Sequence, residues 1–229
     1  MATSGTYAFN PYLGEVVPYA YQLIGIRPSA LLQEHMEAAR MATNMMFMRW
    51  SNQGVNLWEV QLGSIALVQG QTQYSIPSSS VVILDAYIRV TSGTTNTDRL
   101  ILPISRSEYS SYPNKAQQGF PTVYWMDRLL SPSVYLWPVP DGNETSFNYY
   151  YINQIQDTNL TGAQTMDIPS IWLEAMVYGL SYRLAQIWAP EKAVMIKQMS
   201  DESYDIASRQ NVEVAQQYIS PTIAGYFNS

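Results

Sequence analysis

The spacing of apolar residues changes twice along this chain, and that change limits the folds available to it. Residues 15–53 and 167–210 place apolar side chains at helical intervals, whereas residues 58–156 alternate apolar and polar positions between frequent turn residues. This order predicts an α+β protein. We expect the helices of both chain ends to pack as one bundle, with an antiparallel β-sandwich or barrel-like domain inserted between them.

The predicted organisation has four parts. Residues 1–56 form an N-terminal arm and helices, and residues 57–162 form the β-domain, from which the loop 105–121 protrudes. Residues 163–212 form C-terminal helices that pack on residues 15–53, and residues 213–229 form a tail. The tail is either disordered or held by a partner, and we favour the partner because of its aromatic residues.

The N-terminal part predicts a short helix over residues 15–26 and a longer one over residues 30–50. Ser29 is the expected N-cap of the second helix, and Gly54 its expected C-cap. Its main apolar stripe leaves three methionines on other faces of the helix: Met41, Met45 and Met48. Burial on more than one side suits either a central helix clasped by its neighbours or a helix in a ring of subunits.

The middle segment predicts six to eight short strands, mostly antiparallel. Residues 64–68 and 72–76 are expected to form a hairpin around Gly70, and residues 91–99 a polar loop. Further strands are expected at 81–90, 100–104, 122–127, 133–137 and 146–155. Alternation places Val82, Leu84, Ala86, Ile88 and Val90 on one face of the first of these, and Phe147, Tyr149 and Tyr151 on one face of the last.

The C-terminal part predicts a helix that starts near Asp167–Ser170 and ends near Trp188, followed by a more charged helix after Pro190. Gly179 falls in the middle of the first helix. Glycine at this position lowers the stability of the helix by roughly 1 kcal/mol relative to alanine. Close approach of another helix is one reason for a glycine to occur there.

The amino-acid composition argues against several classes of function. The net charge is −6 and only 13% of residues are charged, which argues against electrostatic binding of nucleic acid. There are no cysteines and one histidine, so disulfides, cysteine nucleophiles and His-rich metal sites are excluded. No apolar run is long enough to cross a membrane, and the first residues do not read as a signal peptide. The 18 tyrosines suit either protein interfaces or an aromatic β-core.

The chain contains no common catalytic motif, and we expect no enzyme, cofactor or metal. His35 lies on the packed side of its predicted helix, where a histidine is more often a packing residue than a catalyst. Asp201, Glu202 and Asp205 share one side of the last helix. Such a cluster can hold a metal or an acid–base pair, but it is far more often a solvated face.

Four segments in order carry a resemblance to a known family. They are MMFMRWSNQGVNLW at 45–58, LPISRSEYSSYPNKAQQGFPTVYWMDR at 102–128, PSVYLWPVPDG at 132–142 with YYYINQIQD at 149–157, and IPSIWLEAMVYGLSYRLAQIWAPEK at 168–192. Together they resemble the head-to-tail adaptor (connector, tail-tube) proteins of short-tailed bacteriophages. The resemblance covers roughly residues 40 to 210.

The resemblance implies a structural virion protein of the phage tail, assembled in the host cytoplasm. It would form a ring of twelve subunits beneath the portal protein and continue the DNA channel used in genome ejection. The tail nozzle, and in some cases tail fibres, would dock on it. DNA would pass through the lumen without sequence-specific binding, and no membrane would be involved.

The expected interface residues lie in two places. In the loop, the cap Ser105-x-x-Glu108 begins a short helical turn. After it the loop contacts a neighbour or the next tail ring, or it folds back on its own sheet. The candidate residues are Tyr109, Tyr112, Asn114, Lys115, Gln117, Gln118 and Phe120 in the loop, with Tyr218, Ile219, Tyr226 and Phe227 in the tail.

Two other functions remain open. One is a tail nozzle or fibre-anchoring protein, although nozzle proteins are usually far longer and richer in strands. The other is a carbohydrate-binding β-sandwich module, because exposed tyrosine and tryptophan rings suit sugar faces. Such a module has no need for long flanking helices and binds glycan as a monomer.

Overall fold

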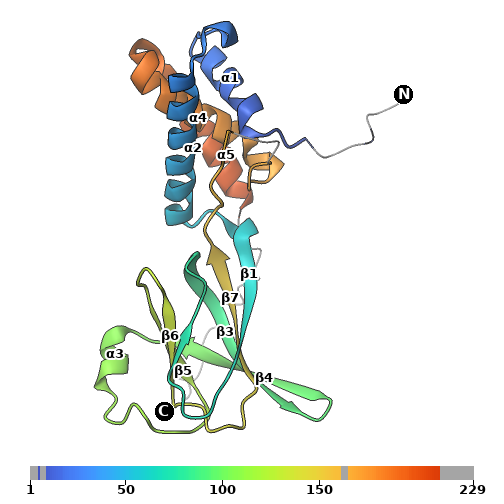
Figure 1. Cartoon of the computed structure of the whole chain (residues 1–229), viewed down its shortest axis with the longest axis vertical. Coiled ribbons are helices and arrows are strands. Elements are labelled where there is room, and N and C mark those ends of the chain that lie inside the picture. Colours follow the sequence, from blue (N-terminus) through green and yellow to red (C-terminus); the bar gives the residue numbers. More distant parts are fainter. Residues whose placement is uncertain (1–4, 6–8, 161–164, 212–229) are drawn as a thin grey trace, which may run out of the picture.

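The computed structural model describes residues 5, 9–160 and 165–211. Most of the helices occupy one end of the elongated molecule, and a seven-stranded sheet with one short helix beside it occupies the other (Figure 1). This arrangement confirms the predicted α+β class. The boundaries predicted between the parts of the chain stay predictions.

Four long helices contribute buried residues to one apolar core. They are α1 (Leu13–Leu23), α2 (Gln33–Gln53), α4 (Leu173–Trp188) and α5 (Ala193–Gln210). Trp172 is fully buried in this core, with its ring 5.2 Å from that of Trp50 and 5.3 Å from that of Trp58. Short 3-10 turns precede the helices or connect them: η1 (Pro28–Ala30), η2 (Leu57–Glu59), η3 (Ser170–Trp172) and η4 (Pro190–Lys192).

The start of α2 differs from the prediction. Ser29 lies in η1, and the helix begins at Gln33 with Leu32 as the N-cap residue. The backbone N–H of Leu32 donates to Nδ1 of His35 at 3.1 Å, so the third residue of the helix makes the return contact of a capping box, whereas the expected serine would have accepted from an N–H of the first turn. The far end agrees with the prediction, because Gly54 ends the helix in the left-handed conformation at φ 70°. The first helix is also shifted: α1 spans Leu13–Leu23.

The strands form one mixed sheet in place of a sandwich of two sheets. The prediction that most strands are antiparallel is confirmed, because β4–β5 is the one parallel pair among the described strands. The order is β1-β7-β3-β4-β5-β6-β2. The bounds are β1 (Val60–Ala66), β2 (Gln73–Ser75), β3 (Ser80–Ser92), β4 (Thr95–Pro103), β5 (Val123–Asp127), β6 (Ser133–Trp137) and β7 (Ser146–Asn153). β4 and β5 run parallel through Leu102–Val123 and Pro103–Tyr124. Residues 104–122, which include helix α3 (Arg106–Ser111), are long enough for the crossover that a parallel pair requires.

The hairpin expected around Gly70 does not form. β1 pairs with β7 and β2 pairs with β6, so the two strands lie at opposite edges of the sheet. The N–H of Gly70 donates to the carbonyl oxygen of Pro140, and the Tyr74 hydroxyl contacts Val68. With these contacts the chain crosses to the far edge of the sheet and does not turn back to pair with β1.

Both faces of β7 contribute buried residues, and Asn148 and Ile152 represent the second face. Phe147, Tyr149 and Tyr151 of β7 are all buried on one face, as predicted. β3 departs from the prediction because its pairing with β7 shifts register between Ile83 and Asp85. The shift places Ile83, Ala86 and Ile88 in the core and leaves Leu84 exposed.

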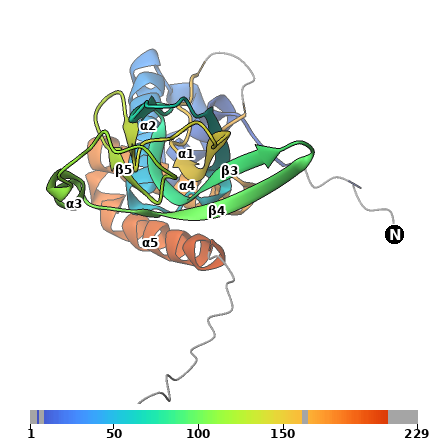
Figure 2. The same ribbon diagram turned by 90° about the horizontal axis from the view of Figure 1, so that it is seen from below.

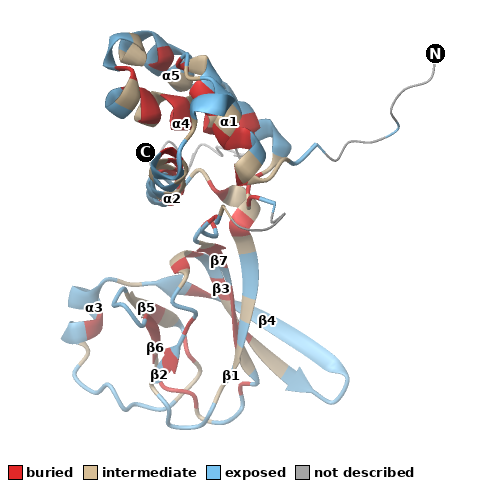
Figure 3. Ribbon diagram, turned by 45° about the horizontal axis from the view of Figure 1, so that its top comes forward, coloured by how far each residue is buried: buried red, intermediate tan, exposed pale blue. Residues whose placement is uncertain are grey.

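Residues 91–99 are not a loop. They belong to a hairpin of β3 and β4 that turns at Gly93 and projects from the sheet on the side opposite α3 (Figures 1 and 2). The tip of this hairpin is exposed on both strands (Figure 3). A strand exposed on both faces needs no apolar alternation, which explains why the sequence pattern suggests a loop here.

Candidate interaction surfaces

The predicted loop 105–121 begins as expected. Ser105 Oγ accepts a hydrogen bond from the backbone N–H of Glu108 at 3.1 Å and caps α3. Tyr109 is buried against the stacked rings of Trp125 and Tyr135, with ring centroids 5.4 and 5.6 Å away. Its ring therefore anchors the loop to strands β5 and β6.

After α3 the loop is held against its own sheet. The Tyr112 ring stacks on Trp137 with centroids 3.9 Å apart and planes within 4°. Trp137 Nε1–H donates to the carbonyl oxygen of Asn114 at 3.1 Å, and Lys115 Nζ donates to the carbonyl oxygens of Ser110 and Tyr112. These contacts give the polar stretch one defined shape.

The last residues of the loop are also held against the sheet. Val139 N–H donates to the carbonyl oxygen of Gln117 at 2.8 Å, and Gln118 forms a parallel bridge with Val139. The Arg99 guanidinium lies 4.8 Å from the centre of the Phe120 ring.

The predicted interface residues thus fall into three groups. Tyr109, Tyr112 and Phe120 hold the loop to the sheet, whereas four other residues of the loop are exposed: Asn114, Lys115, Gln117 and Gln118. Tyr218, Ile219, Tyr226 and Phe227 lie outside the described residues. A role in partner binding stays a prediction for all of them.

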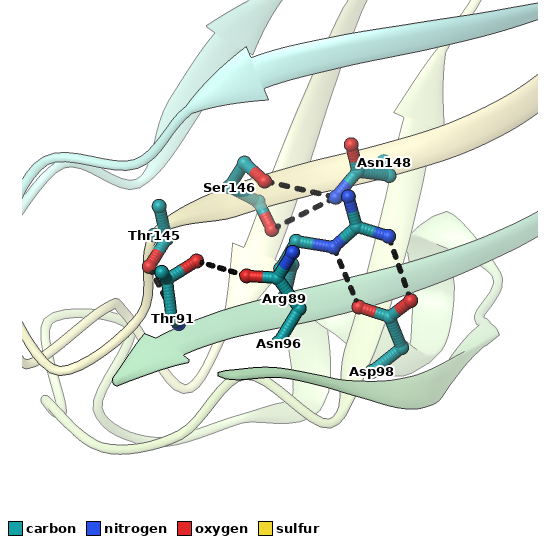
Figure 4. Close-up of polar contacts among 7 residues, drawn as sticks. All are labelled: Arg89, Thr91, Asn96, Asp98, Thr145, Ser146 and Asn148. Atoms are coloured by element: carbon teal, nitrogen blue, oxygen red, sulfur yellow. Dashed lines mark hydrogen bonds and ion pairs between the residues drawn. The ribbon is translucent and has the colours of Figure 1, made fainter. Parts of the chain in front are cut away.

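The β3–β4 hairpin carries a polar ladder that sequence reasoning missed (Figure 4). Arg89 makes a bidentate pair with Asp98, with both N–O distances 2.8 Å. Thr91 Oγ1 donates to Asn96 Oδ1 at 2.8 Å, two residue pairs nearer the tip. The hydrogen bonds from Arg89 lower the pKa of the Asp98 carboxyl, and those to Asp98 raise the pKa of Arg89. The directly opposite pairs stabilise the register of the projecting arm.

The helical end exposes two apolar surfaces. The first, which we call the methionine stripe, comprises Met41, Met45 and Met48, at 50%, 59% and 61% exposure. Their spacing puts them on one side of α2, away from its buried residues. The second, the α1–α4 groove, encloses about 560 Å³ and includes Tyr19, Val177 and Tyr178. Tyr178 and Glu174 also line a smaller groove beside Met199 and Ile206 of α5.

Comparison with known families assigns the chain. A family model described as SU10 adaptor protein matches residues 28–222, which cover both the helical end and the sheet. The chain belongs to the SU10 adaptor family. The broader expectation of a phage adaptor protein is therefore confirmed. Comparison with curated proteins finds no match.

Neither of the adaptor's possible catalytic groups has a catalytic setting. His35 is only 7% exposed, stacks on Trp188 at 4.2 Å and meets the Tyr21 ring edge-on. Asp201, Glu202 and Asp205 are exposed on α5, and Asp205 pairs with Arg209. Across the described residues, no group of three or more potential ligands from His, Cys, Asp and Glu is placed to hold a metal ion. No helix in that part of the chain is both long and apolar enough to cross a membrane.

The adaptor has one buried acidic pair that the sequence did not reveal. Glu59, 7% exposed, hydrogen-bonds to the side chain of Asp167 where the helical end meets the sheet. Asp167 also accepts from Gln156 N–H at 3.0 Å through Oδ2 and from Trp58 Nε1–H at 3.2 Å through its carbonyl oxygen. Burial, and then the Asp167 carboxyl, raise the pKa of Glu59 to about 7. Below about pH 7 the Glu59 carboxyl is therefore mostly protonated and can donate to the half-buried Asp167 carboxylate.

Proposed function

We propose that the protein is a head-to-tail adaptor: a structural virion protein whose ring joins the portal to the tail and continues the DNA channel. The observation that carries the proposal is the adaptor family match, which spans both the helices and the sheet. In this proposal the helices of both chain ends act as one bundle, and the sheet and its loops extend away from it.

A closed ring needs two different lateral surfaces on each subunit, because head-to-tail contacts are heterologous. The methionine stripe and the α1–α4 groove are two such surfaces on the helical end. We place the stripe of one copy against the groove of the next. Methionine suits this role because its flexible thioether adapts to an irregular groove. Twelve copies is the number that the family resemblance implies.

The electrostatics suit a channel protein. The chain carries −6, so a ring of many copies would be strongly acidic. An acidic lumen repels the phosphates of DNA and lets the duplex slide without sticking. No sequence-specific contact with DNA is required.

The loop 105–121 is the proposed contact with the next tail component, the nozzle or fibres. It lies on the sheet, away from the helical end (Figure 1). The loop exposes Asn114, Lys115, Gln117 and Gln118 on a backbone that internal hydrogen bonds already hold in place. A loop with one defined shape loses less conformational entropy when it binds a partner.

The test is mass by light scattering, on the full chain alone and then mixed with its portal ring. A ring from the outset, or a monomer that assembles on the portal, supports the proposal. A monomer that associates with neither itself nor the portal would overturn it. Glycan binding by such a monomer would then favour the carbohydrate-binding module, and association only with nozzle or fibre proteins would favour a nozzle or fibre anchor.

A further inference from the structure

A pocket of about 230 Å³ lies between helices α2, α4 and α5. Three cationic side chains line it: Arg49 from α2, Arg183 from α4 and Lys197 from α5. Asp201 is the one carboxylate among the lining residues described by the structure. The chain as a whole carries −6, so this local excess of positive charge runs against its overall balance.

None of these three cations forms an ion pair within the part of the chain that the structure describes. The ion pairs found there join Arg40 to Glu37, Arg89 to Asp98 and Arg209 to Asp205. Arg183 Nη1 donates to the carbonyl oxygen of Gly179 at 3.3 Å. That bond satisfies one donor, but it leaves the charge of the guanidinium without a counter-charge.

The placement of Arg49 and Arg183 is electrostatically unfavourable without a counter-charge. Arg183 is half-buried, and burial together with the nearby Arg49 charge lowers the pKa of Arg183. A guanidinium nevertheless stays charged in proteins, so the fold holds the half-buried charge of Arg183 close to the like charge of the exposed Arg49. An anion between them would offset both the repulsion and the desolvation. A planar carboxylate matches the guanidinium fork best.

We propose that this pocket binds the carboxylate of an Asp or Glu side chain presented by a protein partner. Arg49 and Arg183 supply the charge-assisted hydrogen bonds. The Tyr204 hydroxyl donates to Gln53 Oε1 at 3.0 Å, which leaves the Gln53 amide N–H₂ group as a further donor in the lining. Aromatic rings in the same lining are typical of pockets that hold anchor residues at protein interfaces.

A nucleic-acid backbone fits this pocket less well. It presents a row of phosphates and is bound by a matching row of cations. Here the cations converge on one concave site, and Asp201 in the lining would repel a neighbouring phosphate. The inference depends on the side chains of one subunit and does not require the proposed ring.

The test uses the full chain with small anions as probes. Thermal unfolding is measured in sodium malonate, sodium phosphate and sodium chloride at equal ionic strength, for the wild type, Arg49→Gln and Arg183→Gln. We expect malonate to raise the Tm of the wild type in a saturating manner, with phosphate less effective. Each variant should bind malonate about tenfold more weakly, because it loses a charge-assisted bond. The exposed Arg128→Gln is the matched control and should respond as the wild type does.

The measurements in sodium chloride distinguish a cation that binds the anion from a residue that only packs in the fold. We expect Arg49→Gln to keep or raise the Tm in chloride, because it removes the repulsion with Arg183. A lower Tm in chloride with an unchanged malonate response would overturn the proposal, as would equal Tm values of the wild type in malonate and chloride. A larger effect of phosphate than of malonate would overturn the assignment to a carboxylate and indicate a phosphate-bearing ligand.

Discussion

Gly179 of α4 lies directly against Met46 of α2. A β-carbon at position 179 would come within 2.7 Å of Met46 Sδ, and Met46 is fully buried. Helices α2 and α4 therefore approach each other closely at this point. It explains a glycine in the middle of a helix that otherwise consists of stronger helix formers.

Gly179→Ala should destabilise the protein by about 1 kcal/mol. Overpacking of the α2–α4 contact lowers the free energy of unfolding by about 1–3 kcal/mol, and the higher helix propensity of alanine offsets roughly 1 kcal/mol of that loss. Chemical denaturation measures the change, and Gln186→Ala on the exposed side of α4 is the control. In the Met46→Ala background the added methyl group should fill space, so the same substitution should become neutral or stabilising. A Gly179→Ala variant that is more stable than the wild type would show that the two helices separate easily.

The raised pKa of Glu59 makes stability depend on pH. The pKa of Glu59 in the folded protein is about 7 against an ordinary value of 4.5, so between these two pH values the folded protein holds a proton that the unfolded chain has lost. Stability from this group is fully present below the unfolded value and is lost as pH rises toward 7. Glu59→Gln should remove this dependence and exceed the wild type in Tm at pH 8.

Melting curves of wild type and Glu59→Gln at half-unit steps from pH 5 to pH 8.5 measure this effect. Glu108→Gln, at an exposed position on α3, is the control and should parallel the wild type. Curves for Glu59→Gln that stay parallel to the wild type across the whole range would contradict a raised pKa at Glu59.

The stacking of Tyr112 on Trp137 should protect the loop from proteases. Lys115 is the one lysine or arginine between residues 107 and 127, so tryptic cleavage after it reports on the loop alone. Tyr112→Ala removes the 3.9 Å stack and should increase the rate of this cleavage several-fold. Mass spectrometry of timed digests measures the rate. Tyr150→Ala, an exposed tyrosine of β7, should leave it unchanged, and equal rates in all three proteins would show that the stack does not hold the loop.

The methionine stripe should govern assembly rather than folding. Met45→Glu places a charge in the middle of the stripe at an exposed position, so the Tm should change little. Self-association, or assembly on the portal, should be lost because a buried unpaired carboxylate opposes the contact. Light scattering and melting curves measure the two effects separately. Leu130→Glu, at a 99% exposed position between β5 and β6, is the control. Normal assembly of Met45→Glu would exclude the stripe from the interface.

Several local features of this protein could be read from the sequence. Gly54 and Ser105 act as the caps that their residue types favour, because capping depends on neighbouring backbone groups. The alternation in β7 correctly predicts that Phe147, Tyr149 and Tyr151 are buried, although Asn148 and Ile152 on the other face are buried as well. Gly179 correctly predicts a close helix contact. Each of these depends on interactions within one element or on one strongly constrained residue.

Only the tertiary structure decided the strand pairing and the composition of the surfaces. β1 and β2 are neighbours in sequence but lie at opposite edges of the sheet, since long-range contacts with β7 and β6 outweigh a local turn at Gly70. The β3–β4 arm carries polar pairs on exposed strands, so no apolar period marks it. Arg49, Arg183 and Lys197 meet only because three helices pack around them. Side-chain spacing along one element determines which face is buried, but it carries no information about which distant element covers that face.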